Sequence, residues 1–444
     1  MNDFLTIIGA GLAGSEAAWQ AAERGVPVVL YEMRSVNRTA AHKTDNCAEL
    51  VCSNSLGNNL PYSAPYILKE ELRNFNSIII SSADTHSVPA GSALAVNREL
   101  FSQEITEKLS NHPLITLKRQ EVISIPSSGP VVIATGPLTS PKLSEVISEM
   151  IGQKYLYFYD ALSPIVDANT IDYDKAFFAS RYGKGEADYL NCPMDEKQYY
   201  DFIRELNSAE KVPLASFEEP KYFEGCMPIE VLAERGPKTL SFGPLKPVGL
   251  TDPNTGKTPY AVVQLRKENK ESSAYNLVGF QTKLTYTEQK RIIRMIPGLE
   301  EVEIFRFGAI HRNTYINSPS LLNNELELKT RPGNYFAGQI TGVEGYLESA
   351  SMGLLASLSA TAKILKKGYI PPPRNTALGA LINYLTASSK KNFQPININF
   401  GLFWVGEMKI RDKNVRNQSI AKNALQELQE WRHNIKDCMR SSVC

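Results

Sequence analysis

The chain begins with short apolar runs separated by stretches of small residues. Apolar residues 4–8 are followed by a G-x-G-x-x-G motif, an alanine-rich stretch over 15–24 and a second apolar run over 26–31, which ends at Glu32. Short apolar runs bounded by turn residues are typical of buried strands, and the alanine-rich stretch favours a helix. The motif comprises Gly9, Ala10, Gly11, Leu12, Ala13 and Gly14. The pattern predicts strand, glycine turn, helix and strand, the βαβ context in which this motif is informative.

Two later segments repeat the pattern of a buried strand followed by small residues. Residues 130–137 predict a strand that ends in Ala-Thr-Gly, and residues 335–340, which include Gly338 and Gln339, predict another. A small-residue turn over 342–346 and a helical stretch from 347 to about 365 follow the second strand. A strand, a small-residue turn and a helix in this order again direct a helix N-terminus toward a ligand.

Roughly 200 residues lie between these two segments, far more than a connection needs, so we expect a second domain there. Apolar stretches near 155–159, 261–265 and 276–280 predict strands within it. We expect four parts: residues 1–154 and 301–403 as two parts of one nucleotide-binding domain, residues 155–300 as an inserted domain on the substrate side, and residues 404–444 as a basic helical tail.

The composition is that of a packed globular protein, with 43% hydrophobic and 21% charged residues. No run approaches the 18 or so consecutive apolar residues of a membrane span. The first residues lack the basic region of a signal peptide. Six cysteines are spread along the chain without the spacing of a disulfide framework. We therefore expect a cytoplasmic protein with no membrane partner.

Charge is distributed unevenly along the chain. Residues 361–444 carry 14 Lys or Arg against 5 Asp or Glu, a balance of +9, whereas the whole chain has a net charge of +1. A basic terminal region on an acidic body is expected where one face contacts phosphate. A solvated lysine-rich tail is the alternative interpretation of the same composition.

Each glycine of the first motif has a distinct expected task. Gly9 permits the tight turn, Gly11 lets the backbone approach a pyrophosphate, and Gly14 lets the helix pack closely on the strand. Glu32 is placed to accept hydrogen bonds from an adenosine ribose. This βαβ unit alone does not decide whether the ligand is NAD, FAD or S-adenosylmethionine. No second G-x-G-x-x-G is present, so a separate NAD(P)H domain is not indicated.

Two cysteines lie in segments that differ from a packed core strand. Cys52 lies in a polar, turn-forming stretch after the ribose-binding strand, and Cys226 lies in a rigid turn between Gly225 and Pro228. Free cysteines are more often inert core residues, and a reactive thiol needs a nearby cation or helix terminus. The chain has five histidines and no His-x-x-x-His or Cys-x-x-Cys spacing, so we expect no metal site.

Seven segments carry a more specific pattern: residues 9–20, 49–55, 88–91, 134–141, 224–228, 311–314 and 337–339. Together they resemble the folate- and FAD-dependent tRNA (uracil-5-)-methyltransferase family, from about Asp3 to about Phe403. The resemblance implies an α/β fold, with a glutathione-reductase-like FAD-binding Rossmann domain and a large inserted α+β domain. It also implies that the first motif, Glu32, Gly338 and Gln339 bind FAD.

The resemblance further implies an enzyme that forms 5-methyluridine at position 54, in the T loop of tRNA. In that family 5,10-methylenetetrahydrofolate supplies the carbon, and FAD reduced by NAD(P)H supplies the electrons. Because uracil C5 is a poor nucleophile, a thiolate must first add to C6. We expect Cys226 to be this nucleophile and Cys52 to be the thiol that acts as base at C5. The exchanged assignment is the alternative.

The residues alone do not exclude three other functions. These are the same chemistry on a ribosomal RNA uridine, a plain FAD-dependent oxidoreductase, and a non-catalytic flavoprotein that binds RNA. We expect no obligate protein partner. Candidate RNA contacts, through phosphates or through stacking on an extruded uridine, are Arg374, Lys390, Lys391, Asn392 and Phe393. For Phe393 the alternative is a place in the core.

Overall fold

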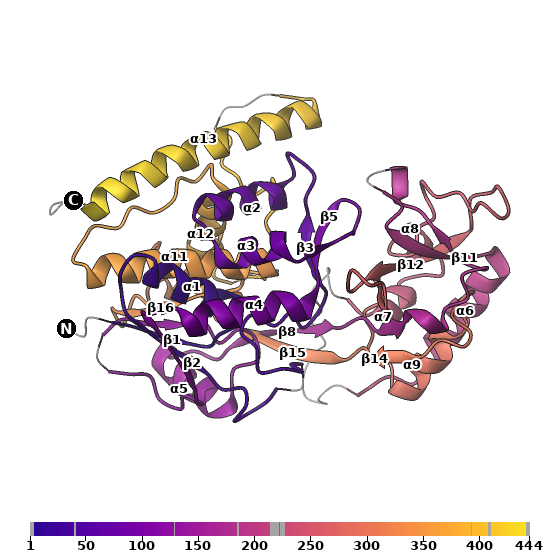
Figure 1. Ribbon diagram of the computed structural model, residues 1–444, viewed down its shortest axis with the longest axis horizontal. Helices are drawn as coiled ribbons and strands as arrows, with labels where there is room; N and C mark the ends of the chain where they lie inside the picture. Colours follow the sequence, from indigo (N-terminus) through magenta and orange to yellow (C-terminus); the bar gives the residue numbers. More distant parts are fainter. Residues whose placement is uncertain are drawn as a thin grey trace.

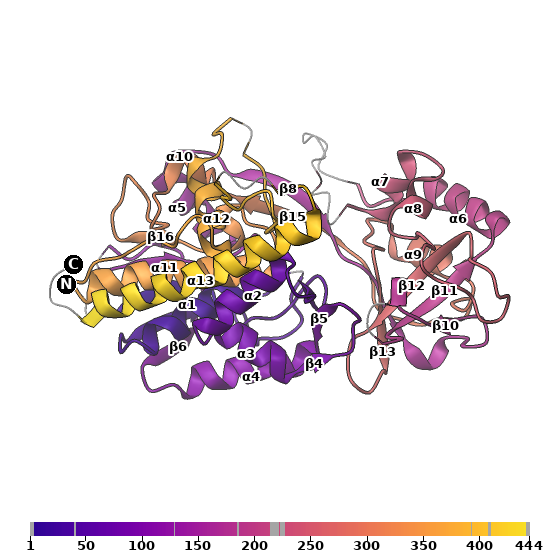
Figure 2. The ribbon, with the colours of Figure 1, turned by 90° about the horizontal axis from the view of Figure 1, so that it is seen from above.

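The computed structural model describes residues 4–39, 41–127, 129–183, 186–213, 222, 227–391, 393–406 and 410–440. Two lobes lie side by side along its longest axis (Figures 1 and 2). The parallel-sheet lobe, on the left of Figure 1, contains both ends of the described chain. The antiparallel-sheet lobe, on the right, is built from the middle of the chain.

A five-stranded parallel sheet forms the centre of the parallel-sheet lobe. Its strand order is β16 (Asn334–Phe336), β7 (Val131–Ile133), β1 (Leu5–Ile8), β2 (Val28–Glu32) and β6 (Ile115–Arg119). Every residue of β1, β7 and β16 is buried, as expected for parallel strands covered on both faces. The strands predicted over 4–8, 26–31, 130–137 and 335–340 correspond to β1, β2, β7 and β16 of this sheet, and the predicted α/β fold class is confirmed.

Two helices, α1 (Leu12–Ala22) and α11 (Tyr346–Ile364), pack closely against each other. A Cβ atom on Gly353 of α11 would lie 2.1 Å from the carbonyl oxygen of Ala13, so only glycine permits this approach. The hydroxyl of Ser357 donates a hydrogen bond of 2.7 Å to the carbonyl of Ala17. The two predicted helices are therefore joined across more than 300 residues of sequence.

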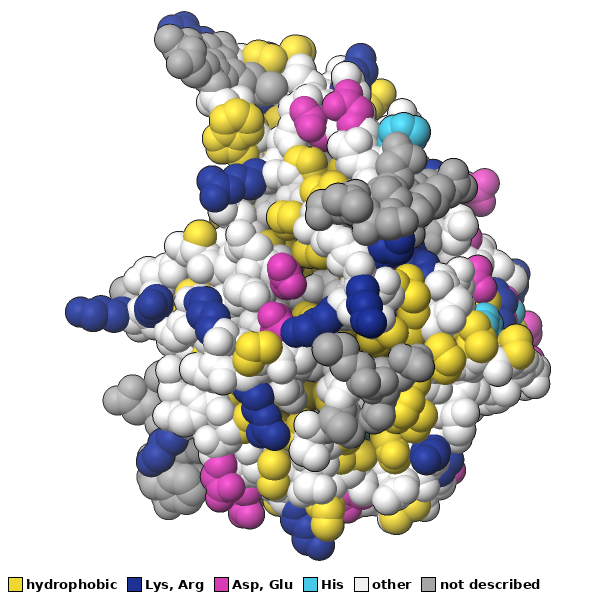
Figure 3. Space-filling model, turned by 90° about the vertical axis from the view of Figure 1, so that its left-hand side faces the viewer, with side chains coloured by type: hydrophobic (Ala, Val, Ile, Leu, Met, Phe, Trp, Pro, Cys, Tyr) yellow, Lys and Arg dark blue, Asp and Glu magenta, His cyan; other side chains and the backbone are white. Residues whose placement is uncertain are grey.

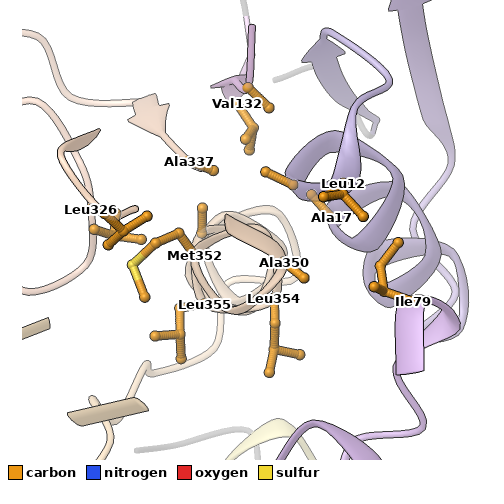
Figure 4. Close-up of a cluster of buried hydrophobic side chains, with 14 of the residues drawn as sticks. Leu12, Ala17, Ile79, Val132, Leu326, Ala337, Ala350, Met352, Leu354 and Leu355 are labelled. Atoms are coloured by element: carbon orange, nitrogen blue, oxygen red, sulfur yellow. The ribbon is translucent and has the colours of Figure 1, made fainter. Parts of the chain in front are cut away.

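The α11 helix consists mainly of small and apolar residues and is buried around nearly its whole circumference. Figure 4 shows side chains leaving its axis in several directions, with Ala350 toward α1 and Met352 toward Leu326. Val132 of β7 lies on the sheet side of the same cluster. The helix thus fixes its own N-terminus relative to the sheet, and this end faces the site described below.

The remaining elements of this lobe complete the layers around the sheet. They are α2 (Ala64–Asn74), α3 (Ile78–Thr85), α4 (Arg98–Asn111), α5 (Pro141–Ile151), α10 (Ser318–Leu321), α12 (Ala377–Ala387) and a small sheet of β3 (Ser55–Asn58), β5 (Ala93–Val96) and β4 (Ser87–Val88). The buried carboxylate of Glu71 on α2 accepts the amides of Ala377 and Leu378 at 2.6 and 2.8 Å. It thereby satisfies the first amides of α12.

The antiparallel-sheet lobe has a separate hydrophobic core. Its strand order is β10 (Phe177–Phe178), β11 (Tyr189–Met194), β12 (Ala261–Lys267), β13 (Ala274–Leu277), β9 (Ile165–Asp167) and β14 (Ile304–Arg306). Its helices are α6 (Glu196–Ser208), α7 (Ile229–Glu234), α8 (Thr239–Phe242) and α9 (Tyr286–Ile293). An antiparallel pair, β8 (Leu156–Ala161) and β15 (Ile310–Tyr315), runs between the lobes.

The domain boundaries expected from the sequence stay predictions. The strand β14 follows residue 300, yet it pairs with β9 and so belongs to the antiparallel sheet. In the part of the chain that the structure describes, no helix has the length and apolarity needed to cross a membrane.

The basic C-terminal region is part of the parallel-sheet lobe. The long helix α13 (Lys413–Arg440) lies along the outside of this lobe and packs on α2 (Figures 1 and 2). Trp431 of α13 is 2% exposed, contacts Phe75 and donates a hydrogen bond of 2.9 Å to the carbonyl of Ile370. The helix is therefore anchored by buried contacts and not held by charge alone.

We expect Trp431→Ala to destabilise the protein by about 3–5 kcal/mol, because it removes a buried aromatic side chain and leaves a cavity. Thermal melting measures the change. Val415→Ala on the same helix is the matched control, since Val415 is 50% exposed and its replacement is expected to leave the melting temperature unchanged. Equal melting temperatures for the wild type and Trp431→Ala would contradict the packing of α13.

Phe393, expected as an RNA contact or as a core residue, is a core residue. It is 3% exposed, and its ring contacts those of Tyr315 and Tyr384. It is also so close to Gly342 that a Cβ atom there would lie 2.5 Å from the ring. Arg374, Lys390 and Lys391 are exposed, whereas Asn392 lies outside the described residues.

Candidate active site

A deep groove runs along the carboxyl ends of the parallel strands. It has a volume of about 1040 Å³ with its open mouth included. The strand ends contribute Ile8 and Gly9 after β1, Glu32 at β2, Ala134 after β7 and Gly338 after β16. Ligands of open α/β sheets bind outside these strand ends, so the groove is the expected site for a nucleotide.

The glycine turn between β1 and α1 has the geometry that a pyrophosphate needs. Gly9 has φ of +99°, and a Cβ atom on Gly14 would lie 1.7 Å from the carbonyl oxygen of Gly9. Gly11 differs from both, because its φ of −70° suits any residue and an added Cβ would meet no protein atom within 4 Å. The space beside Gly11 is therefore open to the groove. Leu12 and Ala13 also line the groove, and the amide of Ala10 donates a hydrogen bond of 2.9 Å to Glu32.

Glu32 lies where the sequence places it, at the end of β2, and lines the groove. Its two carboxylate oxygens accept bonds from the amides of Ala10 and Arg34 and from two nitrogens of the Arg34 guanidinium, all at 2.9–3.0 Å. Burial disfavours the charge, but Arg34 and these amides together lower the pKa of Glu32 to about 2. Arg34, which sequence reasoning missed, thus fixes Glu32 as a buried carboxylate, and the ribose contact stays a prediction.

The turn after β16 forms the other side of the groove. Gly338 has φ of +82°, and a Cβ atom there would lie 2.7 Å from the Ala13 side chain. The side-chain Nε2 of Gln339 donates a hydrogen bond of 2.5 Å to the carboxyl group of Glu344, whose pKa is raised well above its usual value by burial and by Asp160. The side chain of Glu344 therefore favours its neutral form at this end of the groove.

These residues fit a bound FAD. The N-terminus of α1 and the open space beside Gly11 suit the pyrophosphate, and the turn that contains Gly338 and Gln339 suits the flavin end. The groove walls are mainly apolar, as expected for a site that buries most of its ligand.

Cys52 lies in the loop of residues 50–54, next to the groove. Its neighbour Val51 lines the groove, and so does Tyr346, the first residue of α11. The Tyr346 hydroxyl accepts hydrogen bonds from the amides of Cys52 and Ser53, at 2.8 and 3.1 Å. The loop that carries Cys52 is thus attached directly to a groove wall, and Cys52 is partly exposed.

Three arginines surround this loop, and sequence reasoning identified none of them. Arg98 on α4 donates to the carbonyls of Leu50 and Cys52, at 3.0 and 3.4 Å. Arg306 on β14 donates to the carbonyl of Val51. Arg266 on β12 donates to the side-chain oxygen of Asn54 at 2.9 Å. All three guanidinium groups interact electrostatically with Cys52.

Of the other cysteines, two are buried, and Cys226 lies in a segment that the structure does not describe. Cys47 and Cys192 are fully buried, and burial raises the pKa of both thiols, so they are inert core residues. Cys226 lies outside the described residues, and its distance from Cys52 is therefore not given. Among the described residues, no group of three or more His, Cys, Asp or Glu side chains is arranged to hold a metal ion.

Comparison with known proteins extends this picture. Residues 5–368 match the family model described as "Glucose inhibited division protein A". The chain is 57% identical over 427 residues to methylenetetrahydrofolate--tRNA-(uracil-5-)-methyltransferase TrmFO of Heliobacterium modesticaldum, covering 96% of this chain and 97% of the relative. The protein of the same name from Enterococcus faecalis is 58% identical over 425 residues, covering 96% and 98%.

Among solved structures, GidA of Aquifex aeolicus superposes with a TM-score of 0.71 at 18% identity, covering 99% of this chain and 74% of that chain. This likeness shows the fold. The 427 aligned residues of the Heliobacterium relative exceed the length between Asp3 and Phe403, so the similarity extends past Phe403 and into the C-terminal region. A match of this identity and coverage shows that the chain belongs to the methylenetetrahydrofolate--tRNA-(uracil-5-)-methyltransferase family.

Proposed function

We propose that this protein methylates C5 of a uridine in tRNA, with 5,10-methylenetetrahydrofolate as carbon donor and FAD reduced by NAD(P)H as reductant. The observation that carries the proposal is the identity of 55–58% across nearly the whole chain to relatives named for this activity. The groove beside Cys52 supports it independently, because it combines a dinucleotide-type site with a partly exposed thiol. Position 54 of the T loop is the proposed target, and the cytoplasm the proposed compartment.

The two cysteines are proposed to act as nucleophile and as base. The thiolate of Cys226 adds to C6 of the uracil, which makes C5 nucleophilic toward the methylene carbon of the folate. Cys52 then removes the C5 proton, and the bond between the methylene carbon and the folate nitrogen breaks, so that tetrahydrofolate leaves. Bound FAD, when reduced, would supply the hydride that converts this methylene to a methyl group, and the C6–S bond breaks to release the product. The exchanged roles of the two cysteines are the alternative within this proposal.

The direct test uses FAD-loaded protein, labelled methylenetetrahydrofolate, NADPH and an unmodified tRNA transcript, followed by nucleoside analysis. We expect labelled 5-methyluridine at position 54. A ribosomal RNA transcript assayed in parallel separates the two RNA substrates. Steady NADPH oxidation without RNA or folate, and without product, would instead indicate a plain flavin oxidoreductase.

The exposed basic residues of the C-terminal region are proposed to contact tRNA phosphates. Figure 3 shows Lys and Arg side chains scattered over the end of the molecule on the left of Figure 1, not gathered into one patch. Replacing surface residues tests this better than truncating the chain, because α12 and α13 contribute buried residues such as Leu381 and Trp431 to the core.

We expect the double change Lys390→Glu and Lys391→Glu to weaken tRNA binding and to reduce the slope of log affinity against log salt by about 1 to 2, because each phosphate contact contributes about 0.7–0.9. Filter binding at several salt concentrations measures both quantities. Lys142→Glu on α5 is the control, since this side chain is exposed and lies outside both the basic C-terminal region and the inserted domain. An unchanged slope in the double variant would remove these two lysines from the RNA-contacting surface.

A further inference from the structure

The loop of residues 50–54 is held by hydrogen bonds from both lobes, and a buried ion pair joins the two lobes beside it. The side chains of Arg98 and Glu268 are 13% and 8% exposed, and they form two hydrogen bonds, Nε to Oε2 at 2.6 Å and Nη2 to Oε1 at 3.1 Å. Arg98 belongs to the parallel-sheet lobe and Glu268 directly follows β12 of the antiparallel-sheet lobe. Two parallel bonds of this kind fix the plane of a guanidinium group.

The same guanidinium also fixes the loop. Its two terminal nitrogens donate to the carbonyls of Leu50 and Cys52, one on each side of Val51. Arg98 therefore has one side turned to Glu268 and the other to the peptide that carries the thiol. Burial opposes the charge of Arg98, but Glu268 raises the pKa of Arg98 above its ordinary value, so the arginine stays charged.

Further contacts from β12 and β14 reach the same loop. Asn54 is fully buried, and its amide donates to the carbonyls of Val96 in one lobe and Lys267 in the other, at 3.1 and 3.0 Å. Arg266 and Arg306 add bonds to Asn54 and Val51 from the antiparallel sheet. The position of the Cys52 loop therefore depends on where the antiparallel-sheet lobe places these groups.

We propose that Glu268, acting through Arg98, is a positioning residue that sets the place of the Cys52 thiol against the groove. This inference rests on the catalytic role of Cys52 proposed above. Neither Glu268 nor Arg98 lines the groove, so they act on the loop and not on the cofactor. A displacement of about 1 Å at a reacting group costs on the order of 100-fold in rate, so a loosened loop is expected to lower kcat strongly.

The test compares Glu268→Gln with the double variant Arg98→Met and Glu268→Met. Gln keeps the volume of Glu268 but cannot accept two bonds from the guanidinium, because one of its two terminal groups is a donor. The Met pair removes both charges, and such apolar replacement of a buried ion pair often preserves stability. Glu300→Gln is the control, because Glu300 forms an ion pair with Lys175 on the exposed surface of the same lobe.

Four quantities are measured for each variant: the FAD content, the melting temperature, the rate at which iodoacetamide alkylates Cys52, and kcat and KM for tRNA. For Glu268→Gln and for the Met pair we expect full FAD content, KM within about twofold, a kcat lowered by about 100-fold, and a changed alkylation rate. Glu300→Gln is expected to match the wild type in all four.

Two outcomes would overturn the proposal. One is an unchanged kcat and alkylation rate in Glu268→Gln. The other is recovery of both melting temperature and kcat in the Met pair, which would show that the pair only joins the lobes. If the wild type itself fails to methylate tRNA, the proposed function falls, whereas the alkylation rates still decide whether Glu268 positions Cys52.

Discussion

Replacing Cys226 by alanine is expected to abolish methylation of tRNA while FAD stays bound. Without a thiolate to add at C6, C5 of the uracil cannot attack the methylene carbon, so the loss is expected to be on the order of 10⁴-fold or more, as for other lost nucleophiles. The proposed FAD contacts lie in the glycine turn and in the turn after β16, and Cys226 is not one of them. Absorbance of the flavin and nucleoside analysis measure the two properties separately.

RNA that carries 5-fluorouridine at the target position distinguishes the two cysteines. Fluorine cannot be removed from C5 as a proton can, so the adduct between thiol and RNA is expected to persist. We expect no adduct with Cys226→Ala, and an adduct without methylation with Cys52→Ala. Cys192→Ala is the control, because Cys192 is a fully buried thiol of the antiparallel-sheet lobe. An adduct mapped to Cys52 would exchange the roles, and full activity in both alanine variants would refute the thiol mechanism.

The sequence predicts the parallel-sheet lobe well because its signals are local. The glycine turn, the strands on either side of it and the alanine-rich helix follow each other within about 30 residues, as a βαβ unit requires. The strand over 334–336 and the helix that follows are likewise predicted from one continuous stretch. For such elements, periodicity and turn residues specify the structure without knowledge of the rest of the chain.

The surroundings of Cys52 could not be predicted in this way. Arg98 and Glu268 are 170 residues apart in sequence, and Arg306 is 255 residues from its partner Val51. No spacing rule connects such residues, because they meet only after the two lobes have packed. The nearest signal was the turn over 342–346, whose last residue is Tyr346, but nothing in it indicates a hydrogen bond to the Cys52 loop.

Composition was also ambiguous at the C-terminus. The balance of +9 over residues 361–444 describes charge but not burial. In α13 the buried residues recur at helical spacing, as in Ala424, Leu428, Trp431 and Ile435, while the side chains of Lys413, Arg416, Lys422 and Glu430 are exposed. The same segment therefore completes the core of the parallel-sheet lobe and presents basic side chains to solvent. Phe393 was ambiguous for the same reason, because an aromatic residue next to lysines is consistent both with a place in the core and with stacking on RNA.

We expect Gly11→Val to remove FAD from the purified protein while leaving the fold intact. The φ of −70° at Gly11 suits valine, and an added Cβ atom meets no protein atom within 4 Å. The added Cβ atom therefore takes its space from the groove, where a ligand would lie. We expect FAD occupancy to fall at least tenfold, which corresponds to about 1.4 kcal/mol or more of binding free energy.

Gly14→Ala is the comparison that separates a lost cofactor site from a disturbed fold. Its Cβ atom would lie 1.7 Å from the carbonyl oxygen of Gly9, so this variant is expected to lower the melting temperature of the protein even without cofactor. Gly11→Val is expected to melt at the wild-type temperature when both proteins are free of FAD, and below it when FAD is added in excess. The wild type gains stability from FAD, whereas the variant does not. A Gly11→Val protein that purifies yellow and fully loaded would place the pyrophosphate elsewhere in the groove.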